Sequence, residues 1–266
     1  MASVSERLAR ALLQYSSPLR SLRQVPVIGD CLSWLGTGMV PRDTRTWAQV
    51  KDGPAAGIWL RLNPRTGLDA IRGVGEPEVQ DALVQRLRAG MTFYDLGANI
   101  GFLSLLGARL VGDRGRVFAF EADPEIAGRL REHVERNSCA QVTVIEKAVW
   151  SEAGKVFFER VGAATSPDRG LGHVVAGAGA NTLEIEAITL DEFAKTAPPP
   201  DFIKCDVEGA EVEVFRGAQK LLAEKRPVIV CEIHCEANRS SLLKDLQNLG
   251  YVCEQSGARQ LLALPR

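Results

Sequence analysis

The chain has 266 residues, of which 45% are hydrophobic and 24% charged. These proportions are ordinary for a globular protein and allow one large α/β domain with appendages. The formal net charge of −1 gives no electrostatic case for a nucleic-acid partner. The charge is uneven, because residues 1–50 carry six arginines and three acidic residues, a net +3 that leaves −4 for the remainder.

The six cysteines show none of the Cys-x-x-Cys spacing that binds zinc. Three of them, Cys205, Cys231 and Cys253, fall inside predicted strands, where a free thiol behaves as a small hydrophobe. Four arginines interrupt residues 1–30, so we expect no secretory signal, and no run of 18 apolar residues predicts a transmembrane helix. We therefore expect reduced thiols and a cytoplasmic protein.

The first 69 residues are predicted to be an extension of a main domain that spans 70–266. Apolar residues at helical spacing over 4–14 predict a short helix, which we expect to brace or cover the main domain rather than bind a membrane surface. Residues 46–50 and 58–62 alternate in character around a turn-like Lys-Asp-Gly-Pro stretch and predict a β-hairpin.

The next stretch predicts a strand, a glycine-rich turn and a helix. An amphipathic helix over 78–89 leads to an apolar strand at 91–94, and Asp95 stands at the carboxyl end of that strand. Gly97 and Gly101 permit a tight turn and a close approach of a ligand to the backbone. The following helix directs free N–H groups at the turn. Such a crevice is where open α/β sheets bind ligands.

The spacing of these glycines favours S-adenosylmethionine (SAM) over a dinucleotide. The pattern is Gly-x-x-x-Gly and not Gly-x-Gly-x-x-Gly, and an acid before the first glycine would repel a pyrophosphate. SAM carries an ammonium group and a ribose diol, which suit carboxylates. A second strand over 116–120 ends at Glu121, which is placed to accept both ribose hydroxyls. An ordinary strand–helix connection without a ligand is the alternative.

Strands and helices alternate through the rest of the chain. The predicted core strands after the first two are 142–145, 202–206, 227–234, 251–254 and 260–263. Added strands are predicted at 155–159 and 183–188, a short helix capped by Thr189 or Asp191, one helix from 207 through 222, and another over 239–249. This pattern predicts a doubly wound, mostly parallel seven-stranded sheet that closes with an antiparallel hairpin.

Residues 161–181 are rich in glycine and alanine and nearly free of large side chains. A loop of this length in a compact domain is usually functional or disordered. We expect a mobile lid over the acceptor site, because such a composition packs weakly and leaves the backbone free. A disordered insertion without a role is the alternative.

Several motifs resemble those of the FkbM family of SAM-dependent methyltransferases. They are FYDLGANIG at 93–101, EADP at 121–124, IKCDVEGAE at 203–211, RP at 226–227 with EIH at 232–234, and GEPE at 75–78. The resemblance covers residues 70–255 and implies a class I, Rossmann-like methyltransferase fold with SAM across the carboxyl ends of the first strands. Members of the family mostly methylate hydroxyl groups of sugars and polyketides.

The resemblance implies a role for each matching position. Around the methionine part of SAM it places Asp95, Gly97, Asn99 and Gly101. It implies that Glu121 holds the ribose and that Asp206 lies near the methyl donor. On the adenine side it places Ala122, Lys147 and Ala148. Lys147 has the alternative of a solvated strand end, because lysine is usually exposed.

The catalytic centre is predicted at the ends of the fourth and fifth core strands, where Asp206, Glu232 and His234 stand. In one interpretation His234 or Asp206 is a general base that removes the proton of the acceptor hydroxyl. In another, all three residues bind a divalent cation such as Mg²⁺ or Mn²⁺, which lowers the hydroxyl pKa. In a third, Glu232 and His234 only brace a strand end.

The sequence thus predicts a SAM-dependent O-methyltransferase that acts on a hydroxyl of a small molecule, a glycan or a glycolipid. Two other classes are the alternatives. A methyltransferase fold can serve as a non-catalytic partner module, because fold alone does not decide function. A nicotinamide-dependent oxidoreductase is disfavoured by the missing dinucleotide glycines.

Overall fold

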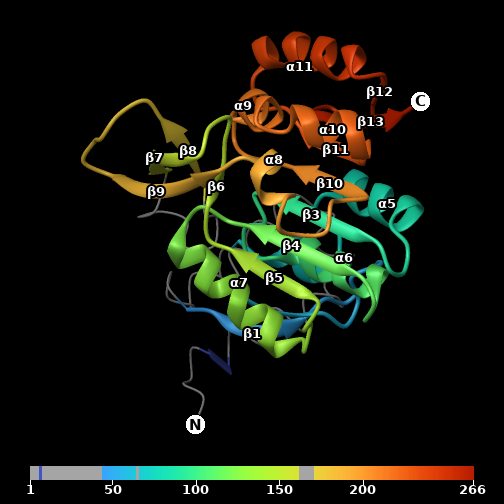
Figure 1. Cartoon of the computed structure of the whole chain (residues 1–266). Coiled ribbons are helices and arrows are strands. Elements are labelled where there is room, and N and C mark those ends of the chain that lie inside the picture. The colour runs from blue at the N-terminus through green and yellow to red at the C-terminus, as the bar shows by residue number, and fades with distance from the viewer. Residues whose placement is uncertain (1–5, 8–43, 64–65, 162–170) are drawn as a thin grey trace, which may run out of the picture. The chain divides into compact units, whose positions relative to one another are not determined.

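The structure, a computed structural model, describes residues 6–7, 44–63, 66–161 and 171–266 (Figure 1). These residues fall into two compact units, which divide between Gly75 and Glu76. The smaller unit contains strands β1 (Thr46–Gln49) and β2 (Trp59–Leu62), which pair antiparallel with Thr46 opposite Leu62, and helix α4 (Leu68–Arg72). The predicted hairpin is present, and the helix predicted over 4–14 lies largely outside the described residues.

The larger unit is built on a seven-stranded sheet of order β12-β13-β11-β10-β3-β4-β5. Its parallel strands are β3 (Thr92–Leu96), β4 (Arg116–Phe120), β5 (Val142–Ile145), β10 (Phe202–Cys205) and β11 (Val228–Glu232). Strands β12 (Tyr251–Gln255) and β13 (Gln260–Pro265) form the antiparallel edge. The predicted sheet is confirmed, and its order reverses between β3 and β10, the position at which α/β sheets bind ligands.

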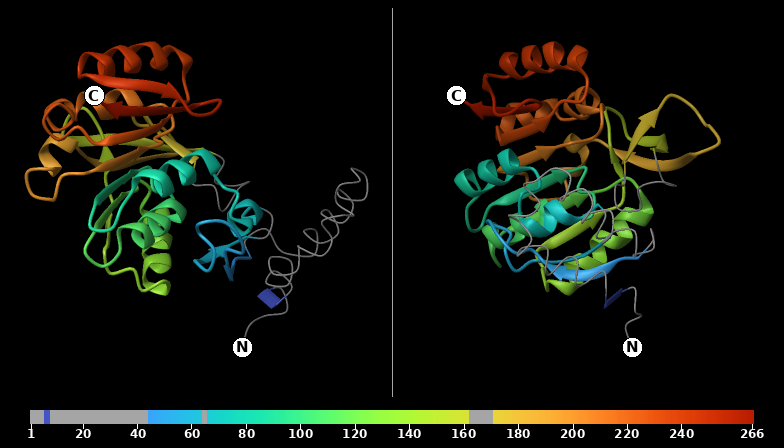
Figure 2. Two further views of the ribbon diagram at one scale, coloured as in Figure 1. Left: turned by 90° about the vertical axis from the view of Figure 1, so that its right-hand side faces the viewer. Right: turned by 180° about the vertical axis from the view of Figure 1, so that it is seen from behind.

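Helices cover both faces of this sheet (Figures 1 and 2). They are α5 (Pro77–Arg86), α6 (Phe102–Val111), α7 (Pro124–Arg136), α8 (Leu190–Phe193), α9 (Glu211–Arg216), α10 (Gln219–Lys225) and α11 (Glu236–Asn248). Alternate side chains of β3 serve opposite faces. Tyr94 makes edge-to-face ring contacts with Phe118 and Phe193, whereas Phe93 packs closely on Gly107 of α6. None of the described helices is long and apolar enough to cross a membrane.

The single helix predicted over 207–222 is wrong, because the structure has two helices, α9 and α10, with a break at Gly217. The reason is a long-range contact, because the carboxylate of Asp191 accepts hydrogen bonds from the amides of Lys220 and Leu221 and so caps a new helix start at α10. A Cβ atom on Gly217 would lie 2.2 Å from the carbonyl oxygen of Trp150, so the chain passes the Trp150 segment where no side chain fits. Glu208 stands in the turn before α9, with φ 53°, and does not open the helix.

The added strands form a separate four-stranded sheet of order β6-β9-β7-β8. Its strands are β6 (Ala148–Val149), β7 (Gly154–Val161), β8 (Leu171–Val175) and β9 (Thr182–Ile188). The expectation of a loop throughout 161–181 is therefore wrong for β8. This strand pairs antiparallel with β7, and a Cβ atom on Gly172 would lie 2.2 Å from the Phe158 ring. Residues 162–170 of the proposed lid lie outside the described residues, whereas residues 176–181 connect β8 to β9 without regular secondary structure.

Candidate cofactor and catalytic site

The glycine-rich turn after β3 is required by the protein's own packing. Gly97 and Gly101 have φ values of 72° and 87°, which favour glycine. A Cβ atom on Gly97 would lie 1.8 Å from the backbone oxygen of Asp206, and one on Gly101 would lie 2.0 Å from Leu130. Asn99 also has a left-handed φ of 51°, and its Oδ1 accepts a hydrogen bond from the amide of Ile100 at 2.7 Å. The turn thus packs directly against the backbone that follows β10.

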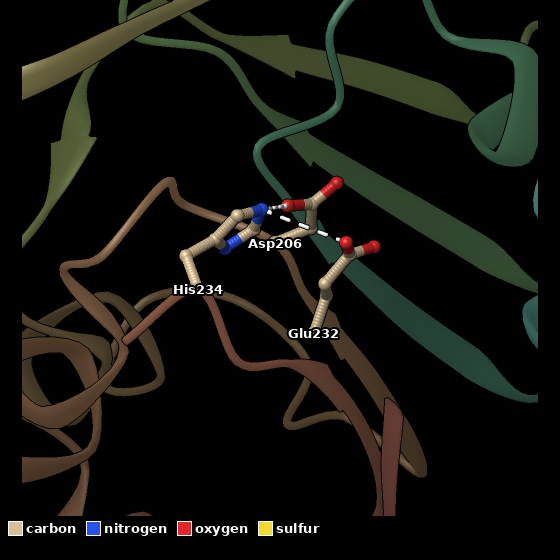
Figure 3. A group of neighbouring side chains, drawn as sticks. All are labelled: Asp206, Glu232 and His234. Atoms are coloured by element: carbon tan, nitrogen blue, oxygen red, sulfur yellow. Dashed lines mark ion pairs between the residues drawn. The ribbon is translucent and has the colours of Figure 1, made fainter. Parts of the chain in front are cut away.

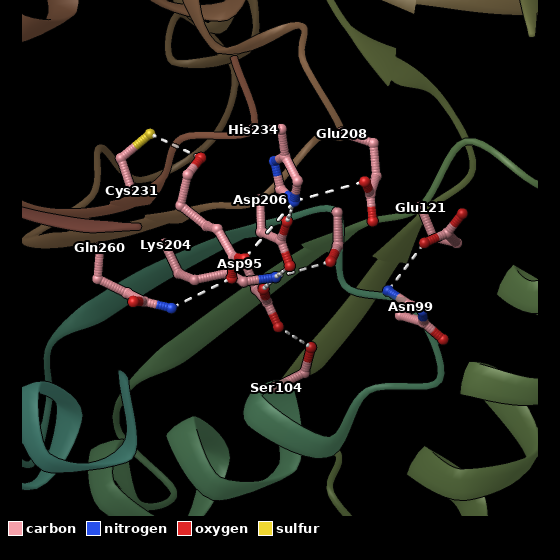
Figure 4. Close-up of polar contacts among 12 residues, drawn as sticks. Asp95, Asn99, Ser104, Glu121, Lys204, Asp206, Glu208, Cys231, His234 and Gln260 are labelled. Carbon is pink, nitrogen blue, oxygen red and sulfur yellow. Dashed lines mark hydrogen bonds and ion pairs between the residues drawn. The ribbon is translucent and has the colours of Figure 1, made fainter. Parts of the chain in front are cut away.

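Asp95 supports this turn from inside the protein. Its side chain has no exposed surface, Oδ2 accepts a hydrogen bond from the Ser104 hydroxyl at 2.5 Å, and Oδ1 lies 3.5 Å from Nζ of Lys204. Lys204 donates to the carbonyl of Gly97 at 2.8 Å and lies 3.5 Å from Asp206 (Figure 4). Asp95 therefore stabilises the turn through Lys204, which contacts both the Asp95 carboxylate and the carbonyl of Gly97. The sequence prediction gave Lys204 no role, although a lysine inside an apolar strand is unusual and indicates a buried charge that needs partners.

The charge of Lys204 is secured by the carboxylates around it. Burial by itself lowers the pKa of this lysine, but the charges of Asp206, Asp95 and Glu76 outweigh that effect, so its pKa lies above the ordinary value. Lys204 is therefore a permanent cation that links the end of β10 to the glycine-rich turn. This cation compensates the fully buried charge of Asp95.

Glu121, at the end of β4, has a carboxylate oriented by two backbone amides. Oε2 accepts from the amide of Asn99 at 2.8 Å (Figure 4). Oε1 accepts from the amide of Asp123 at 2.9 Å. Burial raises the pKa of Glu121 to about 7, against the effect of these two hydrogen bonds. The side chain is thus a preorganised acceptor, directly between the glycine-rich turn and the start of α7.

A pocket that is open to solvent, with about 440 Å³ of empty space that includes its solvent-filled mouth, lies beside Glu121. Its wall includes several of the residues predicted on the cofactor side, namely Gly97, Glu121, Ala122, Lys147 and Ala148. Lys147 also pairs with Glu186 of β9 at 2.8 Å, so its ammonium group is partly engaged by the added sheet. The structure therefore brings together residues from three separate predicted motifs.

Asp206, Glu232 and His234 meet at the carboxyl ends of β10 and β11, with ligand-type atoms all within 4.8 Å of one another (Figure 3). Nε2 of His234 lies 3.5 Å from Asp206 and 3.6 Å from Glu232. It also lies 3.4 Å from Glu208. These residues converge because β10 and β11 are parallel neighbours, so their ends share one edge of the sheet.

Glu211 determines the orientation of His234. Its side chain has no exposed surface, and Oε1 accepts a hydrogen bond from Nδ1 of His234 at 3.0 Å. This hydrogen bond raises the pKa of His234, burial lowers it, and the charges of Glu208 and Asp206 raise it further, to about 9. At neutral pH the imidazole is therefore mostly protonated. The sequence marked Glu211 only as part of a motif and did not predict this contact.

Glu76 is a third residue whose part in the site the sequence did not predict. It precedes α5 with a left-handed φ of 50°, an unusual conformation for glutamate. Its Oε2 is buried and has no hydrogen-bond partner among the described residues. Burial raises the pKa of Glu76 to about 7, Lys204 lowers it, and Asp206 raises it. Its carboxylate thus belongs to the same electrostatic cluster as the predicted catalytic residues.

Comparisons with known proteins agree with this geometry. The Methyltransferase FkbM domain profile matches residues 95–253, more than half of the chain. The hexuronic acid methyltransferase AglP of Haloferax volcanii is 32% identical over 173 residues, which cover 64% of this chain and 67% of that protein. A protein-L-isoaspartate O-methyltransferase of Methanococcoides burtonii is 32% identical over only 60 residues, 23% of this chain and 30% of that protein.

Among solved structures, methyltransferase FkbM from Methylobacillus flagellatus aligns with a TM-score of 0.49 and 15% identity. The alignment covers 89% of this chain and 59% of that one. The family resemblance seen in the motifs is thus confirmed by the profile match and by the alignment with the archaeal relative. The chain belongs to the FkbM family of SAM-dependent methyltransferases.

Proposed function

We propose that this enzyme transfers the methyl group of SAM to a hydroxyl group of a sugar or a sugar-bearing molecule. One observation carries the proposal. The same edge of the sheet holds both the pocket beside Glu121 and the cluster of His234 with Asp206, which can accept a proton. The name of the archaeal relative, a hexuronic acid methyltransferase, supports a sugar as the acceptor.

The residues of the pocket suit SAM. A mostly apolar surface that includes Phe120 and Val149 fits an adenine ring, and the oriented carboxylate of Glu121 fits a ribose diol. We assign Ala122, Lys147 and Ala148 to the adenine side. The turn formed by Gly97, Asn99 and Gly101 is assigned to the methionine part. When bound, SAM supplies a methyl group on a positively charged sulfur.

The chain's own residues must align the acceptor and remove its hydroxyl proton. We propose that the neutral form of His234 takes the hydroxyl proton on Nε2, because Glu211 binds Nδ1 and directs Nε2 toward Asp206. Asp206 stabilises the imidazolium that results. Because the pKa of His234 is about 9, turnover should rise with pH until His234 loses its proton.

A divalent cation held by Asp206, Glu232 and His234 is the second candidate mechanism. The observation that favours it is the convergence of one nitrogen and two carboxylate ligands within 4.8 Å. Such ligands suit Mg²⁺ or Mn²⁺, and Glu211 would then orient the histidine ligand from outside. A bound cation would replace the proton on His234. Exhaustive EDTA treatment therefore separates the two mechanisms, since only the metal-free base keeps full activity after it.

The test is transfer of labelled methyl from SAM to a panel of neutral sugars, uronic acids and glycolipids. We expect Asp206→Ala and His234→Ala each to lower kcat by roughly 100-fold or more. His173→Ala is the matched control, because His173 is partly exposed on β8 and pairs with Glu159 outside the cluster. Near-wild-type turnover in both cluster variants would refute the assignment. Calorimetry that detects binding of NAD but not of SAM would favour an oxidoreductase instead.

A further inference from the structure

The added sheet presents one face of strand β7 to the cofactor pocket. Side chains alternate along a strand, so Phe158 and Arg160 share one face of β7 while Lys155 lies on the other. Phe158 is buried, stands opposite Val174 of β8, and both side chains line the pocket beside Glu121. Lys155 pairs instead with the exposed Glu184 of β9. The two faces of the same strand therefore have different surroundings.

Arg160 connects this sheet to Glu121 through a short chain of contacts. Its guanidinium group makes two hydrogen bonds of 2.5 Å to the carboxylate of Asp123, whose side chain is 6% exposed. Asp123 caps α7 by accepting from the amide of Glu125 at 2.9 Å. The amide of Asp123 donates to Glu121. A bidentate arginine–carboxylate pair is rigid, so it restricts both the Asp123 side chain and the adjoining backbone.

We propose that strands β7 and β8 are part of the cofactor site, with Phe158 and Val174 closing the pocket over the adenine ring and Arg160 positioning Glu121 through Asp123. The inference rests on the proposed function, because it requires SAM in this pocket. The proposed site then consists of the family motifs together with one wall of the pocket that the added sheet supplies. Arg160 is a positioning residue, since its guanidinium group reaches Asp123 and not the cofactor.

Electrostatics give Arg160 a further effect on the same carboxylate. The charge of Asp123 disfavours the ionised form of Glu121 and raises its pKa, in addition to the larger effect of burial. Arg160 offsets the charge of Asp123. Without Arg160, Glu121 should therefore be both less ordered and more often protonated at neutral pH, and each change weakens an acceptor for ribose hydroxyls.

The experiment measures dissociation constants for S-adenosylhomocysteine by calorimetry, which needs no acceptor and no turnover. We expect Arg160→Ala to weaken binding about tenfold or more, the range of a charge-assisted contact, and Arg160→Lys to recover part of the loss. Phe158→Leu should also weaken binding. Lys155→Ala, on the opposite face of β7, is the matched control and should leave the dissociation constant unchanged.

A double-variant cycle distinguishes positioning from general stabilisation. If Arg160 acts through Glu121, the Glu121→Gln/Arg160→Ala pair should bind no more weakly than Glu121→Gln alone. Additive losses, or an unchanged dissociation constant in Arg160→Ala together with a lowered Tm of the free protein, would overturn the inference. Failure of the wild type to bind S-adenosylhomocysteine would instead refute the proposed function. Binding that depends on Glu121 but not on Arg160 or Phe158 would refute this inference alone.

Discussion

Glu211→Gln should lower the pKa of His234. The glutamine keeps an oxygen that can accept from the amide of Gly209, as Glu211 does at 2.9 Å, but it removes the buried negative charge 3.0 Å from Nδ1 of His234. The hydrogen bond from Glu211 is the largest cause of the raised pKa of His234. Asp206, Glu208 and Glu232 face the same ring and stay in place.

The magnitude follows from the pKa. At a pKa of about 9, only about 1% of His234 is neutral at pH 7, compared with about 75% at the ordinary value of 6.5. A hydrogen bond to a charged group contributes about 1.5–3 kcal/mol, which corresponds to about one to two pH units. The pKa of His234 should therefore be about one to two pH units lower in Glu211→Gln than in the wild type. The neutral fraction at pH 7 should rise at least about tenfold.

The same shift makes a prediction about stability. The folded-state pKa of His234 lies above its value in the unfolded chain, so protonation favours the folded state. This contribution, about 3 kcal/mol, is complete below about pH 6.5 and is lost as the pH rises through about 9. Urea unfolding of the EDTA-treated protein at pH 6 and at pH 9.5 should show the loss in the wild type and a smaller loss in Glu211→Gln.

The assay is an NMR titration of the imidazole C2–H signals, which is practical because the chain has only three histidines. His173→Ala and His234→Ala identify their own signals, and EDTA keeps metal ions out of the measurement. Glu213→Gln is the matched control, because Glu213 lies on the same helix but pairs with the exposed Arg216. A His234 midpoint near 6.5 in the wild type, or the same midpoint with and without Glu211, would refute the reasoning.

Three further predictions concern the cofactor crevice. Glu121→Ala should weaken SAM binding by about 1–3 kcal/mol in calorimetry, and unchanged affinity would contradict the ribose assignment. Gly97→Ala should destabilise the fold by about 1–3 kcal/mol because of its left-handed backbone, and further because the new Cβ would overlap Asp206. Gly128→Ala is the control, since this helical position is open and should not be destabilised. Equal urea midpoints for the two variants would count against the packing argument. Lys204→Met should cost about 3–5 kcal/mol, because it leaves the charge of Asp95 buried without compensation; a loss below about 1 kcal/mol in urea unfolding would contradict that view.

The sequence by itself determined the seven-stranded sheet and the position of the candidate site. Hydrophobic runs, the glycine-rich turn and the acids at strand ends are local features, and each follows from a few adjacent residues. The meeting of Asp206 with Glu232 and His234 could also be predicted, because parallel neighbouring strands bring their carboxyl ends to one edge. The helix over 207–222 failed as a prediction because local periodicity cannot detect that Asp191, distant in the sequence, caps the start of α10.

Only the tertiary structure decided which side chains control those groups. Lys204 under the glycine-rich turn, Glu211 behind His234 and Arg160 against Asp123 each depend on how deeply two distant segments are buried together. The added sheet is of the same kind, because β8 carries a weak strand pattern and becomes a strand only by pairing with β7. Burial and pairing are properties of the assembled chain. Spacing in the sequence therefore predicted the candidate site, while long-range packing decided the charge and orientation of its residues.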